Sequence, residues 1–508
     1  MVDVIDRRSK SKTTLALKNE NDIFLKRSIK KLESREVESV NTSLLSNNYS
    51  LNYNLLLNEE QKKALLSTEG QYLVIAGAGS GKTRTIVYRT AWLIENGIKE
   101  EKILMITFTR KASEEMKSRL KEILKRDEVK VTITTFHSFC ARLIRKYENI
   151  FKLIDFEIID EERRKKIFEY LIKKMDLNRK YKDNFYTVDE LSEGLSKVQN
   201  RKLKVEEVFE KEQLKDDIYK LKSEYKKYKK TNNIYEFDDM IDIVLQKFRD
   251  NREFRDYIKN KIDYLIVDEY QDSNISQMEL LKELIGDTGN LMVVGDDYQS
   301  IYGFRGANFT NILKFGDDFP NSKLIKLKMN YRSSDEIIEY TNRIANKFNL
   351  KYNKTIIGTD VHCEKVHKNS FKNIEEEGDY ICKKILQLKD KIPLEEIAIL
   401  YRNRYIIKAL EKLLKEYGIE YHKKEEESNG VALYTVHSAK GLEWEAVFIP
   451  TLLEGVFPNG IDSENLEEEK RLYYVACSRA KKYLYLSYPR YYYEKLGYFD
   501  KRSRFLNY

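Results

Sequence analysis

The residues best suited to chemistry in this sequence lie at positions 76–83, which read AGAGSGKT. An apolar run, Tyr72–Ile75, comes before them, and a helical pattern begins at Arg84. Glycines let the backbone wrap around a phosphate with its N–H groups pointing inward, and a helix N-terminus adds partial positive charge. In such a loop Lys82 reaches the terminal phosphates and Thr83 holds Mg²⁺. The order of strand, turn and helix therefore predicts a P-loop, although its first residue is Ala where the pattern has Gly.

Two adjacent acids follow a second apolar run. Residues 263–267 read DYLIV, and Asp268 and Glu269 come directly after them. A carboxylate at a strand end can complete a Mg²⁺ site, which is the role expected of Asp268. Glu269 is placed to polarise an attacking water. A solvated turn is the alternative interpretation, and it is weak after so apolar a strand.

Polar residues further along the chain fit the same chemistry. Gln299 follows the apolar run Leu291–Gly295 and can sense the γ-phosphate. Arg332 and Arg479 lie in the second half, where arginines can stabilise transition-state charge as arginine fingers. Any one of these arginines taken alone is more typical of a surface residue.

Composition limits the remaining possibilities. The chain has 508 residues, enough for two to four domains, and its net charge of +9 permits a polyanionic partner without requiring one. The four cysteines form no C-x-x-C pair, so neither a disulfide framework nor a zinc site is indicated. No run of eighteen apolar residues occurs, and the first residues are charged, so we expect a cytoplasmic protein with no membrane partner.

The periodicity predicts two α/β units. Apolar runs at Tyr72–Ile75, Lys102–Thr107 and Val131–Thr134 are each followed by a helical pattern, which is typical of a parallel sheet covered by helices on both faces. A second alternating region begins near residue 320. Between them, residues 151–235 show only charged helical patterns. This insertion is either a solvated helical bundle or a surface that follows a phosphate backbone with the lysines Lys222, Lys226, Lys227, Lys229 and Lys230.

The domain boundaries follow from these changes in pattern. Residues 1–50 form an N-terminal extension, for which a flexible arm is favoured over a docking helix. The first α/β domain comprises residues 51–150 and 236–318, with residues 151–235 inserted. The second comprises residues 319–508.

The motifs, in this order, resemble the superfamily 1 DNA helicases of the UvrD/Rep/PcrA type. The resemblance covers roughly residues 55–508 apart from the inserted regions, and its P-loop begins with Ala, as here. It implies two RecA-like domains, called 1A (51–150 and 236–318) and 2A (319–508), with the helical insertion 1B at 151–235. Besides the motifs above, it rests on LNEEQ at 57–61, NYRS at 330–333, TVHSAKGLEW at 435–444 and residues 468–480.

The resemblance also implies roles at the nucleotide, with ATP and Mg²⁺ as cofactors. Gln61 reads adenine, Tyr331 stacks on it, and Glu443 meets the ribose. Thr83 and Asp268 hold the metal. The implied catalytic residues are Lys82, Asp268, Glu269, Gln299, Arg332 and Arg479. The implied nucleotide-binding residues are Gln61, Ala78, Gly79, Ser80, Gly81, Lys82, Thr83, Arg84, Tyr331 and Glu443.

Single-stranded DNA is the partner that the resemblance implies, either alone or as a 3′-tailed duplex. Residues 107–112 (TFTRKA) and 135–138 (TFHS) resemble the two motifs that line the single-strand track. Phe108, Phe136 and Phe304 are the expected base-stacking residues, and Phe304 stands where relatives usually have Trp. The implied DNA-contacting residues are Phe108, Thr109, Arg110, Phe136, His137, Phe304, Arg305 and His437.

One departure from the family pattern affects the functional prediction. Only residues 403–430 lie where relatives carry the large helical 2B subdomain, so that subdomain is reduced to a short segment. We therefore predict an ATP-dependent 3′→5′ DNA helicase or translocase in DNA repair, recombination or phage defence. The alternative is a single-strand translocase, or the motor subunit of a nuclease complex, with little unwinding of its own. A partner nuclease or repair protein fits so trimmed a motor. A scaffolding subunit with a switch-like ATPase is a third reading, disfavoured because every catalytic position is filled.

Overall fold

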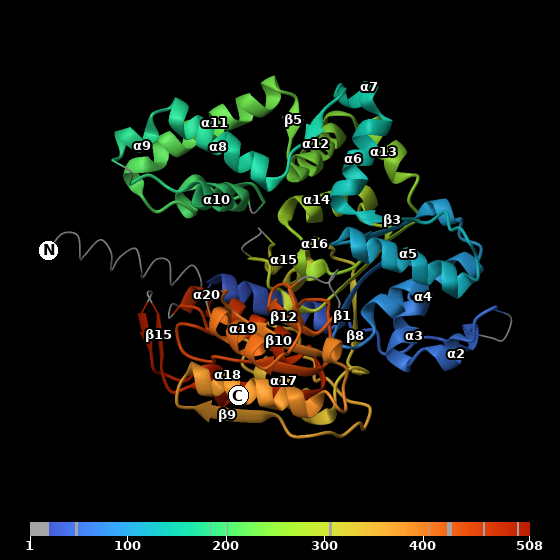
Figure 1. Cartoon of the computed structure of the whole chain (residues 1–508). Helices are drawn as coiled ribbons and strands as arrows, with labels where there is room; N and C mark the ends of the chain where they lie inside the picture. The colour runs from blue at the N-terminus through green and yellow to red at the C-terminus, as the bar shows by residue number, and fades with distance from the viewer. Residues whose placement is uncertain are drawn as a thin grey trace. The chain divides into compact units, whose positions relative to one another are not determined.

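A computed structural model describes residues 20–45, 49–182, 184–200, 202–303, 307–404, 406–423, 429–460, 463–494 and 497–508. At 463–465, 492–494 and 497–498 it describes the backbone alone. The chain divides into two compact units (Figure 1). The first comprises the described residues of Met1–Ile75, Lys82–Gly295 and Tyr302–Ile325, and the second those of Ala76–Gly81, Asp296–Ile301 and Lys326–Tyr508.

A six-stranded sheet forms the centre of the first α/β region. Its spatial order is β3 (Thr132–Thr135), β2 (Ile103–Thr107), β6 (Tyr264–Val267), β7 (Asn290–Gly295), β1 (Gln71–Ala76) and β8 (Lys323–Leu327). The pairs β2–β3, β2–β6, β6–β7 and β1–β7 are parallel. Every residue of β1, β2 and β6 is buried, which is why these strands read as continuous apolar runs.

Helices connect and cover these strands. They are α2 (Tyr53–Leu56), α3 (Glu59–Leu66), α4 (Lys82–Glu95), α5 (Arg110–Leu124), α6 (Phe136–Lys146), α7 (Glu148–Phe151), α12 (Phe237–Asp250), α13 (Arg252–Lys259), α14 (Ile275–Ile285), α15 (Thr310–Leu313) and α16 (Phe315–Asp318). Local signals fix several of their starts. Asn58 and Gln61 form a capping box at α3, and the Thr109 hydroxyl caps α5 by accepting from the Ala112 N–H.

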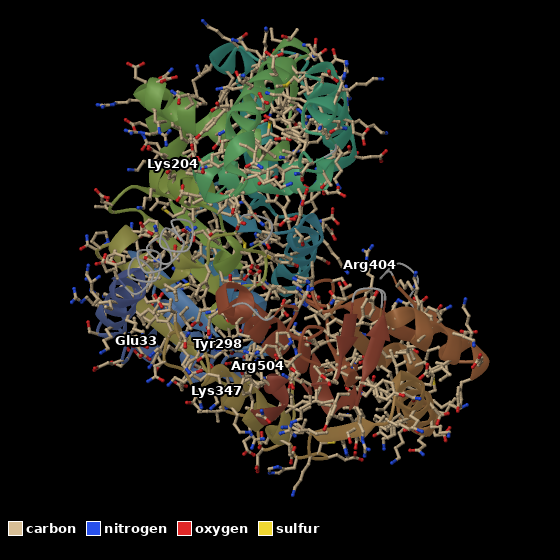
Figure 2. All side chains as sticks on the ribbon, turned by 90° about the vertical axis from the view of Figure 1, so that its left-hand side faces the viewer. Glu33, Lys204, Tyr298, Lys347, Arg404 and Arg504 are labelled. Atoms are coloured by element: carbon tan, nitrogen blue, oxygen red, sulfur yellow. The ribbon has the colours of Figure 1, made fainter. Side chains whose placement is uncertain are left out.

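The helical insertion has a hydrophobic core of its own. It contains β4 (Glu157–Ile158), α8 (Glu161–Lys174), α9 (Leu177–Lys180), α10 (Val188–Asn200), α11 (Lys215–Thr231) and β5 (Ile234–Tyr235). In Figure 1, α8 lies beside α10 and α11. Charged side chains project from the surface of the helical insertion, and the exposed Lys204 is one of them (Figure 2). The two short strands, which the sequence did not predict, pair in parallel where the insertion begins and ends.

The prediction that lysines of α11 follow a phosphate backbone is wrong for one of them. Lys229 is buried, and its ammonium lies 3.2 Å from Glu236 and 2.6 Å from Asp239. Those two carboxylates neutralise it inside the protein, so it offers no charge to DNA. Lys222, Lys226, Lys227 and Lys230 are exposed.

The N-terminal segment from residue 20 packs on the first unit. Residues 20–33 form a helix that buries Leu25, Ile29 and Leu32. Lys31 pairs with Asp317 at 2.7 Å, and the Val37 N–H donates to the carbonyl of Leu324 in β8. The prediction of a flexible arm is therefore wrong for residues 20–37. Apolar residues at helical spacing line one face of this helix, and that face is buried against the first unit. Residues 1–19 lie outside the described part.

The second unit contains a second six-stranded sheet. Its order is β11 (Tyr421–His422), β12 (Val431–Thr435), β10 (Ile397–Tyr401), β13 (Trp444–Ile449), β14 (Ala480–Pro489) and β9 (His367–Phe371), and every neighbouring pair is parallel. The main helices are α17 (Asp335–Ala345), α18 (Ile374–Leu388), α19 (Ile407–Glu416) and α20 (Ser463–Cys477). A short antiparallel pair, β15 (Tyr492–Glu494) and β16 (Gly497–Phe499), follows β14.

Alternate residues of this second sheet enter two different cores. Ala398 and Leu400 of β10 pack with residues of α17 and α20, whereas Ile397 and Ile399 pack with residues of α18 and α19. Successive side chains of a strand point to opposite faces, so helices cover both faces of this sheet. The α/β fold class with two parallel sheets, as two RecA-like domains require, is confirmed.

The carboxyl ends of parallel strands meet at one edge of a sheet, and ligands of such folds bind there. In the first sheet, the segments after β1, β2, β3, β6 and β7 carry the predicted motifs. In the second sheet, residues 435–444 follow β12 in the same way. No helix among the described residues is both long and apolar enough to cross a membrane.

Candidate nucleotide site and nucleic-acid-facing residues

The turn between β1 and α4 has the backbone of a phosphate-binding loop. Gly79 and Gly81 have φ values of 69° and 75°, in the left-handed region that favours glycine. A Cβ added to Gly79 would lie 2.7 Å from the Asn330 side-chain oxygen, so no larger residue fits. The buried Ser80 hydroxyl closes the turn by donating to the Gly77 carbonyl at 2.8 Å. Ala78 is also buried, so its side chain does not project from the loop into solvent.

A hydroxyl and a buried carboxylate meet where the metal is predicted. Thr83, the second residue of α4, donates from Oγ1 to Asp268 Oδ2 at 3.4 Å. Burial, together with the neighbouring Glu269, raises the pKa of Asp268 to about 7, and Lys82 at the start of α4 opposes this rise. A desolvated carboxylate beside a hydroxyl is an all-oxygen donor set that a divalent cation would stabilise. These residues therefore fit Mg²⁺.

Glu269 is held in an unusual backbone conformation. Its φ is 53°, in the left-handed region that a glutamate seldom adopts, and such strain concentrates at functional sites. Its carboxylate accepts a hydrogen bond from the Gln271 side-chain amide. Gln271 is fully buried, and a Cβ on Gly295 would lie 2.7 Å from its side-chain oxygen. Gly295 thus leaves room for the side chain that positions Glu269.

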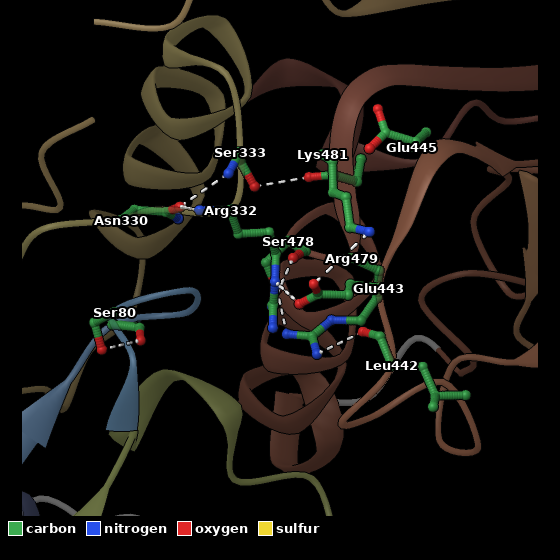
Figure 3. A network of polar contacts seen from close by, with 12 residues as sticks. Ser80, Asn330, Arg332, Ser333, Leu442, Glu443, Glu445, Ser478, Arg479 and Lys481 are labelled. Atoms are coloured by element: carbon green, nitrogen blue, oxygen red, sulfur yellow. Dashed lines mark hydrogen bonds and ion pairs between the residues drawn. The ribbon is translucent and has the colours of Figure 1, made fainter. Parts of the chain in front are cut away.

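The second unit brings the two predicted arginine fingers to one place (Figure 3). Arg332 Nε lies 2.5 Å from Glu443 Oε2, and Arg332 Nη1 donates to the Ser478 carbonyl at 3.3 Å. Partial burial would raise the pKa of Glu443, but Arg332, Lys481 and Arg479 lower it on balance. Glu443 was predicted to meet a ribose, and in this structure its carboxylate restrains Arg332.

Arg479 is 1% exposed, and all three of its nitrogens donate hydrogen bonds. Its Nε bonds the Val475 carbonyl at 3.0 Å and its Nη1 the Leu442 carbonyl at 3.2 Å. Its Nη2 donates to Gln299 Oε1 at 3.1 Å and to Ser478 Oγ at 3.0 Å. The structure therefore joins two residues, Gln299 and Arg479, that lie far apart in the sequence.

Three further residues predicted to bind the nucleotide are Gln61, Arg84 and Tyr331. Gln61 is buried, and its side-chain oxygen accepts from the Asn58 N–H in the α3 capping box. Arg84 is exposed and donates to the Leu56 carbonyl at 3.0 Å. Tyr331 is 54% exposed, while its backbone N–H donates to the Gly79 carbonyl at 3.0 Å. An exposed aromatic ring beside the phosphate loop is suited to stacking on a base, so the adenine roles of Tyr331 and Gln61 stay predictions.

Comparison with known proteins identifies the family. Residues 57–320 match the UvrD/REP helicase N-terminal domain, and residues 325–428 and 422–491 match the UvrD-like helicase C-terminal domain. The chain belongs to the UvrD-type superfamily 1 helicases. The resemblance seen in the sequence is thereby confirmed.

Individual relatives agree with this family assignment. A probable DNA helicase of Mycoplasma pneumoniae is 31% identical over 85% of this chain and 83% of its own length. The ATP-dependent DNA helicase Rep of Buchnera aphidicola is 37% identical over 73% of this chain and 58% of its own length. The ATP-dependent DNA helicase PcrA of Bacillus subtilis is 35% identical over 72% of this chain and 50% of its own length. The chain thus spans only about half the length of the Rep and PcrA relatives that it matches.

In this UvrD-type chain, aromatic residues meet after β2 and β7. Phe108 is half-buried, and its ring stacks on Tyr302 with 5.4 Å between centroids and 12° between ring planes. Thr109 and Arg110, which follow Phe108, are exposed. Aromatic rings with polar neighbours are the kind of surface on which bases stack, and the DNA-contacting roles of Phe108, Thr109 and Arg110 stay predictions.

Phe136 does not fit its predicted role. It is the first residue of α6 and only 5% exposed, so no base can stack on it in this structure. Its neighbour His137 is partly exposed, and His137 Nε2 lies 2.9 Å from Asp238 Oδ1. Burial would raise the pKa of Asp238, but the hydrogen bond and charge of His137 lower it on balance. The helical period places Phe136 toward the core and His137 toward solvent.

The remaining predicted DNA contacts are divided between described and undescribed residues. His437, in the turn after β12, is partly exposed. Three residues beyond it, Lys440 Nζ donates to the Gln299 carbonyl at 2.7 Å. Phe304 and Arg305 lie outside the described residues.

Sequence reasoning assigned no role to four residues that the structure places in contact with predicted site residues or their neighbours. They are Gln271, Tyr302, Lys354 and Lys440. Gln271 and Tyr302 each lie two positions from a residue that the sequence had marked, Glu269 and Phe304. Their polar or aromatic type at that distance was the available signal. Lys354 gave no such signal, because its partners are more than fifty positions away.

Proposed function

We propose that this protein is an ATP-driven motor that moves along single-stranded DNA in the 3′→5′ direction and displaces a complementary strand. The observation that carries the proposal is the group after β6, where Thr83 lies 3.4 Å from the buried Asp268 and Gln271 restrains Glu269. A hydroxyl, a buried carboxylate and a restrained glutamate are suited to hydrolysing a bound triphosphate. The names of the family and of the relatives support DNA as the polymer along which the protein moves.

The residues divide the reaction among themselves. The 76–83 loop and Lys82 bind the phosphates, while Thr83 and Asp268 hold Mg²⁺, which neutralises phosphate charge when bound. Glu269 orients the attacking water and accepts its proton. Arg332 and Arg479 stabilise the negative charge of the transition state, and Gln299 contacts the γ-phosphate. Arg479 and Arg332 are both fixed by hydrogen bonds, so little reorganisation is needed when charge develops.

The proposed DNA contacts use exposed and partly exposed residues of the described chain. Phe108 and Tyr302 stack on bases, Thr109 and Arg110 contact phosphates, and His137 and His437 add polar contacts. Adenine recognition by Gln61 and Tyr331 belongs to the same proposal. Conversion of ATP turnover into movement follows the family mechanism, in which hydrolysis changes how tightly the strand is held.

A second candidate function is translocation with little unwinding. Among the described residues of 403–430 there is one helix, α19, where the resemblance places a large duplex-contacting subdomain. A partner nuclease or repair protein, and a place in repair, recombination or phage defence, stay predictions.

The test is strand displacement on three duplexes, with a 3′ tail, a 5′ tail or blunt ends, run beside ATP turnover with single-stranded DNA and RNA. The proposal expects DNA-stimulated turnover and displacement of the 3′-tailed duplex. Turnover without displacement would favour translocation alone. Turnover that neither DNA nor RNA stimulates would contradict a nucleic-acid motor.

A further inference from the structure

Lys354 is a fully buried lysine that no motif marks. Its Nζ lies 2.6 Å from Asp296 Oδ1 and 2.7 Å from Asp297 Oδ1, and all three side chains are 0% exposed. The same ammonium donates to the Ala76 carbonyl at 3.3 Å, where β1 ends, and lies 4.0 Å from the centre of the Tyr298 ring. A buried charge is retained only with partners of this quality, because removing it from water is costly.

Asp296 connects this lysine to a catalytic side chain. Its Oδ1 accepts from Lys354 and from the Tyr298 N–H at 3.1 Å, and its Oδ2 accepts from Gln299 Nε2 at 2.6 Å. Gln299 Oε1 then accepts from Arg479 Nη2 at 3.1 Å. One line of hydrogen bonds therefore runs from Lys354 through Asp296 and Gln299 to Arg479.

The chemistry of these groups sets the direction of every bond in the line. An ionised carboxylate only accepts hydrogen bonds, and a guanidinium only donates them. Between Asp296 and Arg479 the Gln299 amide has a single satisfying orientation, with its NH₂ toward Asp296 and its oxygen toward Arg479. A neutral side chain at position 296, or a displaced Asp296 carboxylate, would no longer fix the orientation of the Gln299 amide.

We propose that Lys354 is a positioning residue for ATP hydrolysis, which acts by fixing Asp296 and so the Gln299 amide and the Arg479 guanidinium. The proposal deepens the proposed function and rests on it, since it assigns the support of the same catalytic residues. The bond from Lys354 to the Ala76 carbonyl also ties this support to the start of the phosphate loop.

Asp297 provides a matched control. It bonds the same ammonium, and its other oxygen accepts from the Tyr352 N–H at 2.7 Å. Asp297→Asn and Asp296→Asn each neutralise one buried partner of Lys354 with an isosteric side chain. Of these two aspartates, Asp296 accepts a hydrogen bond from the Gln299 side chain, whereas the carboxylate of Asp297 bonds Lys354 and Tyr352.

The first experiment compares the ATP turnover of these two variants. Asp296→Asn is expected to lower kcat about 100-fold with KM for ATP within about threefold, because removing one preorganised contact typically costs that much. Asp297→Asn is expected to keep kcat within about threefold of the unmodified protein. Lys354→Met should resemble Asp296→Asn. Equal losses in the two asparagine variants, or wild-type kcat in Asp296→Asn, would overturn the proposal.

A second experiment does not depend on activity. Asp296→Asn places an NH₂ group against the Gln299 amide, and Gln299→Glu places two carboxylates together. The double variant D296N/Q299E restores one donor and one acceptor at each contact, with net charge unchanged. Its melting temperature should exceed the value expected from the two single changes, and additive effects would overturn the line of bonds. If the unmodified protein hydrolyses no ATP, the proposed function fails, and this cycle still decides whether Lys354 and Asp296 fix residue 299.

Discussion

The guanidinium of Arg479 donates a hydrogen bond to the side-chain oxygen of Gln299, with 3.1 Å between the two atoms, although 180 positions separate them in the sequence. This contact places a predicted arginine finger against a predicted γ-phosphate sensor. Because each side chain holds the other through this bond, a substitution at either residue is expected to alter the position of the other.

Arg479→Lys should lower kcat for ATP by about 100-fold or more. Lysine keeps the charge but loses the planar fork that bonds Gln299, Leu442 and Val475 together. Steady-state ATP turnover measures this. Arg490→Lys, at an exposed position, is the control and should have no measurable effect. Equal rates in the two variants would remove Arg479 from the chemistry.

Leu32→Ala should destabilise the protein by about 2–5 kcal/mol, as expected for a fully buried leucine. Its side chain packs where Gly316 leaves space, so truncation opens a cavity. Thermal unfolding of the full chain measures the loss. Phe24→Ala, in the same helix but 50% exposed, should stay within about 0.5 kcal/mol of the unmodified protein. If both variants melt at the unmodified temperature, the helix over residues 20–33 does not pack as described.

Glu377→Gln should change how stability depends on pH. Burial raises the pKa of Glu377, although hydrogen bonds from Ser487 and Thr451 oppose the rise. A carboxyl with a raised folded-state pKa stabilises the protein at low pH, and this contribution is lost as pH rises from the unfolded-state pKa through the folded one. Glutamine stays neutral and keeps the same partners, Thr451 and Ser487. Its melting temperature relative to the unmodified protein should therefore rise between about pH 4 and pH 7. A difference that is the same at both pH values would contradict the raised pKa.

Phe108→Ala should weaken binding of single-stranded DNA about 5- to 100-fold, since stacking of a base on an aromatic ring contributes about 1–3 kcal/mol. Fluorescence anisotropy of a labelled oligothymidine measures this. Tyr257→Ala removes another half-exposed ring, on α13, and should leave the affinity unchanged. Equal loss in both variants would indicate a general effect of lost aromatic surface, not a stacking site at Phe108.

The sequence predicted the buried centres of both sheets well. Runs such as Lys102–Thr107 and Leu291–Gly295 agree with β2 and β7 within one residue at each end, because strands covered on both faces are apolar throughout. It missed β8 and β9, which lie at the edges of their sheets. Their sequences, KLIKL and HKNSF, mix charged and apolar residues because an edge strand is only partly covered.

Site residues were predictable where a chemically suitable side chain lies next to a recognisable sequence pattern. Thr83 ends the glycine-rich turn, and Asp268 and Glu269 follow an apolar strand. The structure brings Thr83 and Asp268 together. Phe136 was misjudged because residue type alone does not show which face of α6 it occupies. The role proposed for Lys354 could not be predicted from the sequence, because its partners Asp296 and Asp297 are distant in the chain and only the fold brings them to it.

We expect the group after β6 to hydrolyse ATP in response to single-stranded DNA. ATP turnover with and without oligothymidine, compared between the unmodified protein and Glu269→Gln, tests it most directly, with Glu283→Gln as a control on α14. We predict that DNA raises turnover of the unmodified protein and of the control, and that Glu269→Gln loses about 10²–10⁴-fold of it while still binding ATP. A Glu269→Gln variant with unchanged DNA-stimulated turnover would contradict the account.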